Sequence, residues 1–135
     1  MRAWPVRPSE LAGRTVQGRE TAPSTSAAGH AAEARALWHY RLRGYRVLDR
    51  NAWTGGNELD LVVRRGRRLA FVEVKAKGGG RYGDPFEMVT EEKQRRLRRA
   101  AEAWLASHPE AAELEARFDV VAFRGGRLEC LRQAF

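Results

Sequence analysis

The chain has 135 residues, with 25 Lys and Arg against 17 Asp and Glu, which gives a formal net charge of +8. This length suits one ordinary domain, and a hydrophobic content of 43% is enough for one core, which excludes a wholly disordered chain. No apolar run approaches the ~20 residues of a membrane span, and the single cysteine, Cys130, excludes a disulfide framework and a zinc ribbon.

The excess of positive charge indicates an anionic partner, with nucleic acid ahead of an anionic membrane. Lysine supplies only three of the 25 cations, Lys75, Lys77 and Lys93, and the rest are arginines. Codon bias in a GC-rich genome also produces such an arginine surplus, so the net charge alone carries less information about function. Each lysine is correspondingly informative, because it provides a compact ammonium rather than a planar guanidinium.

Residues 1–28 have no sustained apolar period and contain three of the five prolines. We expect a disordered N-terminal tail there and a single domain over residues 29–135. The tail lacks the apolar segment of a secretory signal, so we expect a cytoplasmic protein. Its arginines resemble those of a transit peptide, but Glu10 and Glu20 argue against one. A start codon assigned too far upstream is an equally good interpretation.

The first predicted element of the domain is a helix over residues 31–42, and Gly44 follows as a C-terminal stop. Four apolar residues at helical spacing form the stripe that we expect to face the core: Ala34, Leu37, Trp38 and Leu42.

Three strands are predicted next, over residues 45–53, 58–64 and 68–77. The first two are separated by a Thr-Gly-Gly-Asn turn, and the second and third by an Arg-Gly-Arg tip. A glycine-rich loop then runs from residue 78 to about residue 85.

A second long helix is predicted after Thr90, which can cap it, with Glu91 and Glu92 in its first turn. Its apolar face would contain Leu97, Ala100, Ala101, Trp104 and Leu105. A short helical connection over residues 109–116 leads to strands over residues 117–124 and 128–131, joined by a Gly-Gly hairpin turn. The sequence therefore predicts an α/β domain in the order α-β-β-β-α-β-β, with a mixed sheet of about five strands flanked by helices.

The second and third strands place several charged residues together if they form a hairpin. A two-residue loop at Gly66-Arg67, in a type II′ turn, makes directly opposed residue numbers add up to 133. Asp60 then lies opposite Glu73 and Glu58 opposite Lys75, and all four project from one face of the sheet. The other face of the third strand carries an apolar row suited to packing against a helix: Ala70, Val72, Val74 and Ala76.

Directly opposed carboxylates repel each other. The pairing of Asp60 with Glu73 is therefore best explained by a divalent cation between them, and hard oxygen ligands suit Mg²⁺ or Mn²⁺. Lys75 beside that pair can orient an attacking water or counter the charge that develops on a phosphate. The competing interpretation is a surface strand with a Glu–Lys ladder that faces water, since an acid two positions before a lysine is a weak signal by itself.

Asp60, the Glu73-Val74-Lys75 segment and Glu33 on the preceding helix together resemble the PD-(D/E)xK nuclease superfamily. More closely, residues 29–135 resemble the YraN family of small bacterial proteins, which are similar to archaeal Holliday-junction resolvases. The matching segments are residues 29–33, 44–45, 50–51, 58–62, 71–75, 93, 117–121 and 134–135. Three positions depart from the family pattern without removing a catalytic group: Ala32, Asn57 and Lys77.

This resemblance implies a restriction-endonuclease-like core and a role for each matched residue. Asp60 and Glu73 would be metal ligands, together with the backbone carbonyl of Val74. Lys75 would be the catalytic lysine, and Glu33 would supply a further carboxylate from the first helix. A resolvase needs two active sites, so a homodimer is expected by analogy.

Other charged residues have two interpretations each. Glu58 is either a salt-bridge partner of Lys75 or a further ligand in the site. The cations of the second helix and of the third strand are either solvated or in contact with a nucleic-acid backbone: Lys77, Lys93, Arg95, Arg96 and Arg99. The arginines at the hairpin tip, at residues 64, 65, 67 and 68, are expected to be solvated and within reach of phosphates. Asp119 is interpreted as structural and Cys130 as a buried, inert thiol.

The leading hypothesis is a metal-dependent endonuclease-like protein that acts on DNA, on branched or recombination-type substrates, with no membrane partner. The alternative is a non-catalytic nucleic-acid-binding module of the same fold. A third hypothesis is an adaptor that docks a protein partner through Trp53 and the glycine-rich loop.

Overall fold

A computed structural model describes residues 27–76, 86 and 89–135 of the chain. Most of the expected tail, the expected loop over residues 78–85 and Lys77 lie outside the described residues. The elements of the described part confirm the predicted order: α2 (Ala27–Arg41), β1 (Arg46–Thr54), β2 (Asn57–Arg65), β3 (Arg68–Lys75), α3 (Glu91–Ala106), the 3₁₀ turn η3 (Pro109–Ala111), β4 (Glu115–Arg124) and β5 (Arg127–Leu131).

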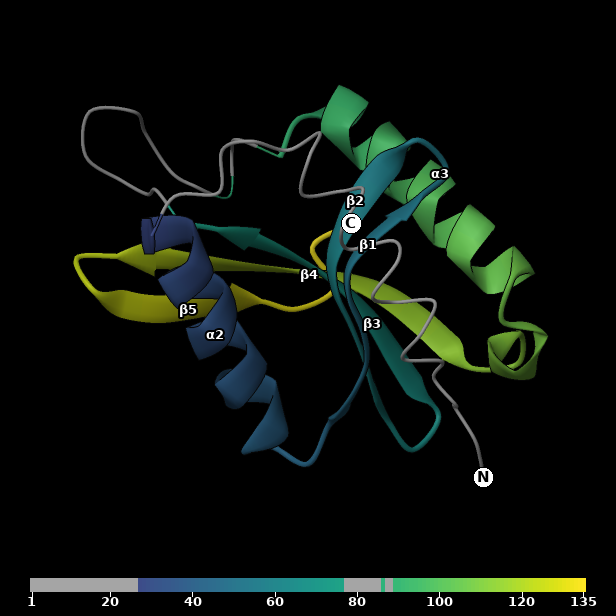
Figure 1. The fold of residues 1–135 in the computed structure, drawn as a ribbon, viewed down its shortest axis with the longest axis horizontal. Coiled ribbons are helices and arrows are strands. Elements are labelled where there is room, and N and C mark those ends of the chain that lie inside the picture. The colour runs from purple at the N-terminus through teal and green to yellow at the C-terminus, as the bar shows by residue number, and fades with distance from the viewer. Residues whose placement is uncertain (1–26, 77–85, 87–88) are drawn as a thin grey trace.

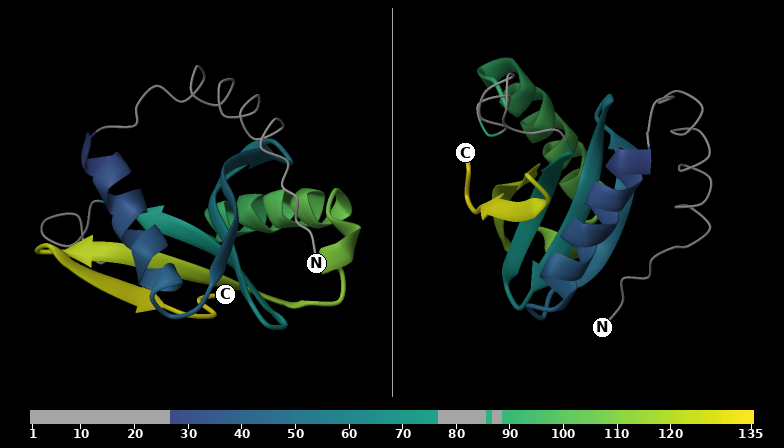
Figure 2. Two further views of the ribbon diagram at one scale, coloured as in Figure 1. Left: turned by 60° about the horizontal axis from the view of Figure 1, so that its bottom comes forward. Right: turned by 90° about the vertical axis from the view of Figure 1, so that its left-hand side faces the viewer.

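The five strands form one mixed sheet in the order β1-β2-β3-β4-β5 (Figure 1). All neighbouring strands are antiparallel except β3 and β4, which are parallel. A parallel pair requires a crossover connection, and α3 lies within it. The helices α2 and α3 cover opposite faces of the sheet (Figure 2). None of the helices in the described ranges is long and apolar enough to cross a membrane.

The hairpin turns follow the glycines as predicted. Gly66 has a φ of +61° and Arg67 does not have a positive φ, which is the pattern of a type II′ turn. The register of β2 with β3 pairs Arg65 with Arg68 and continues to Leu61 with Val72, so the predicted sum of 133 is confirmed over these residues. Regular pairing ends there, before Asp60 and Glu73.

A twist in β1 and β2 determines which side chains meet at this end of the sheet. Ala52 and Leu59 are cross-strand partners and pack on the α3 side, whereas Leu61, two residues further along β2, packs on the α2 side. Residues two apart in a regular strand share a face, so the strands must twist in between. Asn51 has a φ of +48°, in the left-handed region that Asn tolerates better than most residues. The register of β1 with β2 skips Asn51 and Asp60, where the change of face occurs.

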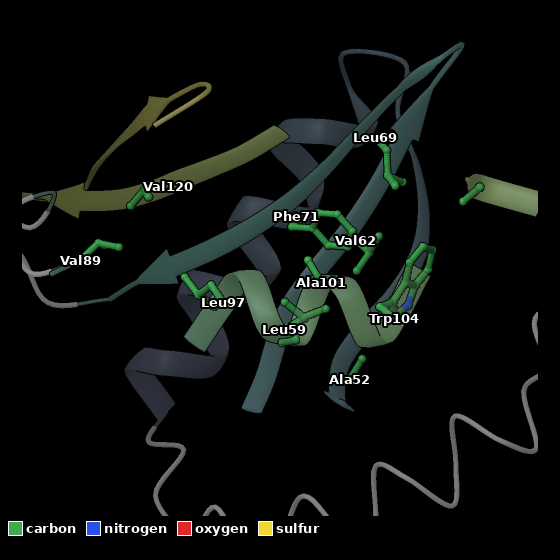
Figure 3. Close-up of a cluster of buried hydrophobic side chains, with 12 residues drawn as sticks. Ala52, Leu59, Val62, Leu69, Phe71, Val89, Leu97, Ala101, Trp104 and Val120 are labelled. Atoms are coloured by element: carbon green, nitrogen blue, oxygen red, sulfur yellow. The ribbon is translucent and has the colours of Figure 1, made fainter. Parts of the chain in front are cut away.

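The core on the α3 side is built around Trp104 and Phe71, whose rings meet edge to face at 5.7 Å (Figure 3). Leu97 and Ala101 of α3 pack on the same sheet face, as predicted. Thr90 caps α3 through a hydrogen bond from the Lys93 amide to its hydroxyl oxygen. The indole N–H of Trp104 donates to the buried carboxylate of Asp49 at 2.9 Å, which fixes α3 against β1.

The predicted apolar stripe of the first helix is wrong except for Leu37. The side chains that α2 buries are Ala32, Ala36, Leu37 and Tyr40, whereas Trp38 and Leu42 are 55% and 76% exposed and Ala34 is exposed. The prediction followed the large apolar residues, but the phenol of Tyr40 is buried because its hydroxyl has a buried partner. The helix also begins at Ala27, so it includes two alanines that were assigned to the tail, which is consistent with the high helix propensity of alanine.

That buried partner is Asp119, which is completely inaccessible to solvent. Its carboxylate accepts hydrogen bonds from the Tyr40 hydroxyl at 2.7 Å, from the Arg117 guanidinium at 2.8 and 3.1 Å and from the backbone N–H of Gln133 at 3.0 Å. The expectation that Asp119 is structural therefore agrees with these contacts, which join α2, β4 and the C-terminal segment. Cys130 was predicted to be buried and is only partly buried. It lies 3.5 Å from the Tyr40 hydroxyl, and burial raises the pKa of its thiol, as expected of an unreactive cysteine.

We predict that Asp119→Ala lowers the free energy of unfolding by about 3 kcal/mol or more, because it leaves the Arg117 charge and the Tyr40 hydroxyl without their buried partner. Urea denaturation followed by tryptophan fluorescence measures this change. Glu129→Ala is the control, since it breaks an exposed ion pair with Arg124 and should cost less than about 1 kcal/mol. Equal unfolding midpoints for the two variants would contradict this role of Asp119.

Candidate functional site

Three elements bring acidic side chains together where β2 and β3 separate. Glu33 comes from α2, Glu58 and Asp60 from β2, and Glu73 from β3, and we call these four residues the carboxylate cluster. The negative charges of the other three all act on the Asp60 carboxyl group, and those of Glu33 and Glu73 also act on Glu58. Glu33, Asp60 and Glu73 are therefore close enough to act on one another, although Asp60 and Glu73 are not the cross-strand pair that the predicted register made them.

Asp60 links the two strands after their regular pairing ends. Its Oδ2 accepts a hydrogen bond from the backbone amide of Val74 at 2.8 Å, so a side chain replaces the backbone acceptor of a regular ladder. Burial raises the pKa of the Asp60 carboxyl well above its usual range, and the nearby Glu73 carboxylate raises it further. The Val74 hydrogen bond opposes these effects only in part. The charged form of Asp60 is therefore disfavoured at this position.

Glu73 is buried, with 7% of its surface exposed, and its Oε2 is shared by two lysines. The ammonium of Lys75 lies 3.5 Å from this oxygen, and that of Lys93, from α3, lies 3.6 Å from it. The chain has only three lysines, and Lys77 lies outside the described residues. Both described lysines therefore meet one carboxylate oxygen, so Lys93 belongs to the site and is not on the outer face of α3.

Asn51 contacts the other two carboxylates of the cluster, those of Glu33 and Glu58. Its side-chain amide lies 3.4 Å from Glu33 Oε2, which is long for a hydrogen bond, and it also bonds to Glu58. Burial raises the pKa of Glu58, and the Asn51 hydrogen bond lowers it. Sequence reasoning did not assign Asn51 to the site, although an Asn inside a predicted strand is unusual enough to be a signal.

Glu58 does not take the predicted position beside Lys75. Within the described part of the chain, the ion pair of Lys75 is with Glu73, and Glu58 interacts with Lys93 instead. The prediction extended the β2–β3 register to Glu58 and Lys75, but the strands separate before reaching them.

The donor groups of the cluster suit a hard divalent cation. Asp60 and Glu73 offer carboxylate oxygens, and Val74, the residue between Glu73 and Lys75, offers a backbone carbonyl. No three Asp, Glu, His or Cys side chains of the described ranges are arranged as a metal-ligating group. Mg²⁺ commonly takes only one or two protein carboxylates and completes its shell with water and substrate phosphate. The residues present therefore fit such an ion through two carboxylates and not through a closed protein cage.

Three of the four predicted nucleic-acid contacts on α3 are on its outer surface, and the fourth is Lys93. Arg95, Arg96 and Arg99 are exposed, and Arg96 forms an ion pair with Glu92 at 2.7 Å. Trp53 is 47% exposed and is the cross-strand partner of Glu58, so an aromatic surface lies next to the cluster.

Comparison with known proteins places all these residues inside one segment that matches a known family. A family described as "Uncharacterised protein family UPF0102" matches residues 32–123. The chain is 45% identical over 120 residues to a UPF0102 protein of Parvibaculum lavamentivorans, covering 86% of this chain and 87% of the relative. It is 46% identical over 118 residues to the UPF0102 protein RSc3265 of Ralstonia nicotianae, covering 84% and 89%. It is 38% identical over 125 residues to the UPF0102 protein YraN of Escherichia coli, covering 90% and 95%.

We predict that Asp60→Asn makes the metal-free protein more stable at neutral pH by about 1 kcal/mol. Burial and the charge of Glu73 make an ionised Asp60 unfavourable, and the neutral amide of Asn avoids that cost. The raised pKa means that folded Asp60 keeps a proton that unfolded Asp has released above pH ~3.9. The stability due to that proton is complete below the unfolded-state pKa and is lost as pH rises through the folded-state pKa.

Urea denaturation in EDTA between pH 4 and 8 tests this prediction. The stability of the wild type should fall with pH relative to Asp60→Asn, and the exposed Glu102→Gln should follow the wild type. A constant difference between wild type and Asp60→Asn across this range would show that Asp60 does not carry the predicted strain.

Proposed function

The chain belongs to the UPF0102 (YraN) family, and we propose that this member is a metal-dependent endonuclease-like protein that hydrolyses DNA phosphodiesters. The observation that carries the proposal is the meeting of Asp60, Glu73 and Lys75 at one point of the sheet. A buried and a partly buried acid beside lysines, in a chain with a net charge of +8, suit a cation held against a polyanion.

Each residue has a separate task in this proposal. Asp60 and Glu73 would hold Mg²⁺ or Mn²⁺, with the Val74 carbonyl as a third oxygen ligand. When bound, such an ion polarises the phosphate and lowers the pKa of a water molecule that it holds. The ammonium of Lys75 would stabilise the charge that develops on the phosphate. Lys93 would supply a second positive charge, and Glu33, held by Asn51, would orient the attacking water.

The arrangement of elements agrees with the sequence resemblance. In the PD-(D/E)xK superfamily, which the motif resembles, the acids and the lysine lie on adjacent strands after a helix that supplies a further carboxylate. Here the same residue types come from α2, β2 and β3. The similarity of the family to archaeal Holliday-junction resolvases makes branched or recombination-type DNA the substrate to test first, with a homodimer as the expected active form.

A second candidate function is a nucleic-acid-binding module that uses the same site without cutting. It is favoured by the two lysines on Glu73, which already neutralise that carboxylate in the metal-free protein, and by the absence of a three-residue ligand group among the described residues. Such a module would bind DNA with salt-sensitive affinity and without turnover.

We predict that the protein cleaves at least one DNA substrate in Mg²⁺ or Mn²⁺ and none in EDTA. The panel consists of linear duplex, single-stranded and four-way-junction DNA, with products resolved on denaturing gels. Asp60→Asn and Lys75→Met should each reduce the cleavage rate by about 10²-fold or more, because each removes a group that acts on the charged transition state.

Glu129→Gln is the matched control, since it removes one carboxylate near the β4–β5 turn and should retain full activity. Cleavage that survives both Asp60→Asn and Lys75→Met would reject this assignment. Binding without cleavage on any substrate would favour the second candidate.

A further inference from the structure

The end of the sheet opposite the carboxylate cluster is dense in arginine. The connection from α2 to β1 and the turn between β2 and β3 lie together at this end, in the lower part of Figure 1 and of the left view in Figure 2. Six arginines come from these segments, and we call them the arginine end: Arg43, Arg46, Arg64, Arg65, Arg67 and Arg68.

Four of these arginines directly oppose each other across strands. Arg46 is the partner of Arg64, and Arg65 is the partner of Arg68. Directly opposed like charges destabilise a sheet. The ion pairs with carboxylates that involve described residues lie elsewhere, at Lys75, Lys93, Arg96, Arg117 and Arg124. Glu115 is the parallel-strand partner of Arg68 but forms no ion pair with it. Codon bias explains an abundance of arginine, but it does not explain why arginines oppose each other here without ion pairs to carboxylates of the described residues.

Backbone carbonyls hold three of these guanidinium groups in place. Arg64 donates to the Gly66 carbonyl at 2.8 Å, Arg65 to the Arg43 carbonyl at 3.0 Å and Arg67 to the Glu113 carbonyl at 2.9 Å. Arg65 also lies over the Tyr45 ring, 5.7 Å from its centroid. A guanidinium has five N–H donors. One hydrogen bond to a carbonyl therefore orients the group, and its charge and remaining donors stay available to a ligand. Planar forks of this kind bind phosphate oxygens in pairs.

We propose that the arginine end is a second contact surface for the phosphodiester backbone of a nucleic acid, separate from the carboxylate cluster. The inference rests on the proposed function in that both sites contact one polynucleotide. Lys75 and Arg68 lie at the two ends of β3, seven residues apart, which is roughly 23 Å at a rise of ~3.3 Å per residue. This length corresponds to about seven nucleotides of a duplex strand at 3.4 Å each. The substrate therefore extends at least that far from the reacting phosphate, as a continuous duplex or as a second arm.

The test compares two double variants of equal charge. Arg46→Gln/Arg68→Gln changes two side chains that form no hydrogen bond or ion pair with other described residues. Arg127→Gln/Arg132→Gln is the control, since it removes two exposed arginines from β5 and the segment after it. Fluorescence anisotropy in EDTA, which prevents metal-dependent cleavage, measures the affinity of each for a labelled 24-bp duplex and a labelled five-nucleotide strand over a range of salt concentrations.

We expect Arg46→Gln/Arg68→Gln to bind the duplex at least tenfold more weakly than the control at 0.1 M salt. The slope of log Kobs against log salt should become shallower by about two, one for each lost phosphate contact. Affinity for the five-nucleotide strand should be unchanged, and Arg46→Lys/Arg68→Lys should keep most of the duplex affinity because it retains the charge.

Equal duplex binding by the two double variants would overturn the inference. Sedimentation with vesicles of anionic phosphatidylglycerol is measured in parallel, and a loss of vesicle binding without a loss of duplex binding would also overturn it, because it would identify a membrane surface instead. Because these measurements need no cleavage, they separate the two proposals. A protein that binds the duplex through Arg46 and Arg68 but never cuts DNA would reject the nuclease assignment alone. A protein that cuts but binds equally well without these arginines would reject the arginine end alone.

Discussion

The repulsion between Asp60 and Glu73 is the constraint on which the rest of the site depends. Two strands bring these carboxylates to one partly buried place, where burial and the charge of Glu73 raise the pKa of the Asp60 carboxyl group. The protein reduces that cost with the Val74 amide on Asp60 and with two lysines on Glu73. It does not remove the cost, because Asp60 keeps a raised pKa. Such an arrangement suits a divalent metal ion, which would offset the negative charge at Asp60 that the two lysines do not neutralise.

Contacts in the surrounding fold position the charged side chains of the site. The left-handed conformation of Asn51 changes the face of β1 and β2 beside Asp60, and its amide then reaches the carboxylates of Glu33 and Glu58. The Thr90 cap sets the first turn of α3, which directs Lys93 to Glu73. Far from the cluster, Asp119 joins α2 to β4 and so fixes the helix that carries Glu33. The site therefore depends on contacts well outside its own residues.

Local patterns predicted the features that local physics determines. The glycine at position 66 predicted the turn, the turn predicted the register, and the register brought Asp60 towards Glu73. The apolar row of β3 likewise packs under α2 as expected. Tertiary contacts decided the rest. Tyr40 is buried because Asp119 accepts its hydrogen bond, Lys93 faces inward because Glu73 attracts it, and the strands separate before Glu58 can reach Lys75. None of these partners is near in sequence, so no periodicity could reveal them.

Binding of Mn²⁺ tests the central claim most directly, because it asks whether the two opposed carboxylates hold a divalent cation. Electron paramagnetic resonance of free Mn²⁺ measures its uptake by the wild type, by Asp60→Asn and by Glu73→Gln, each with and without a five-nucleotide DNA strand. The account predicts about one ion bound per chain in the wild type, with affinity increased by the DNA strand and reduced at least tenfold in both variants. Equal Mn²⁺ binding by all three proteins, or no binding even with DNA, would contradict it.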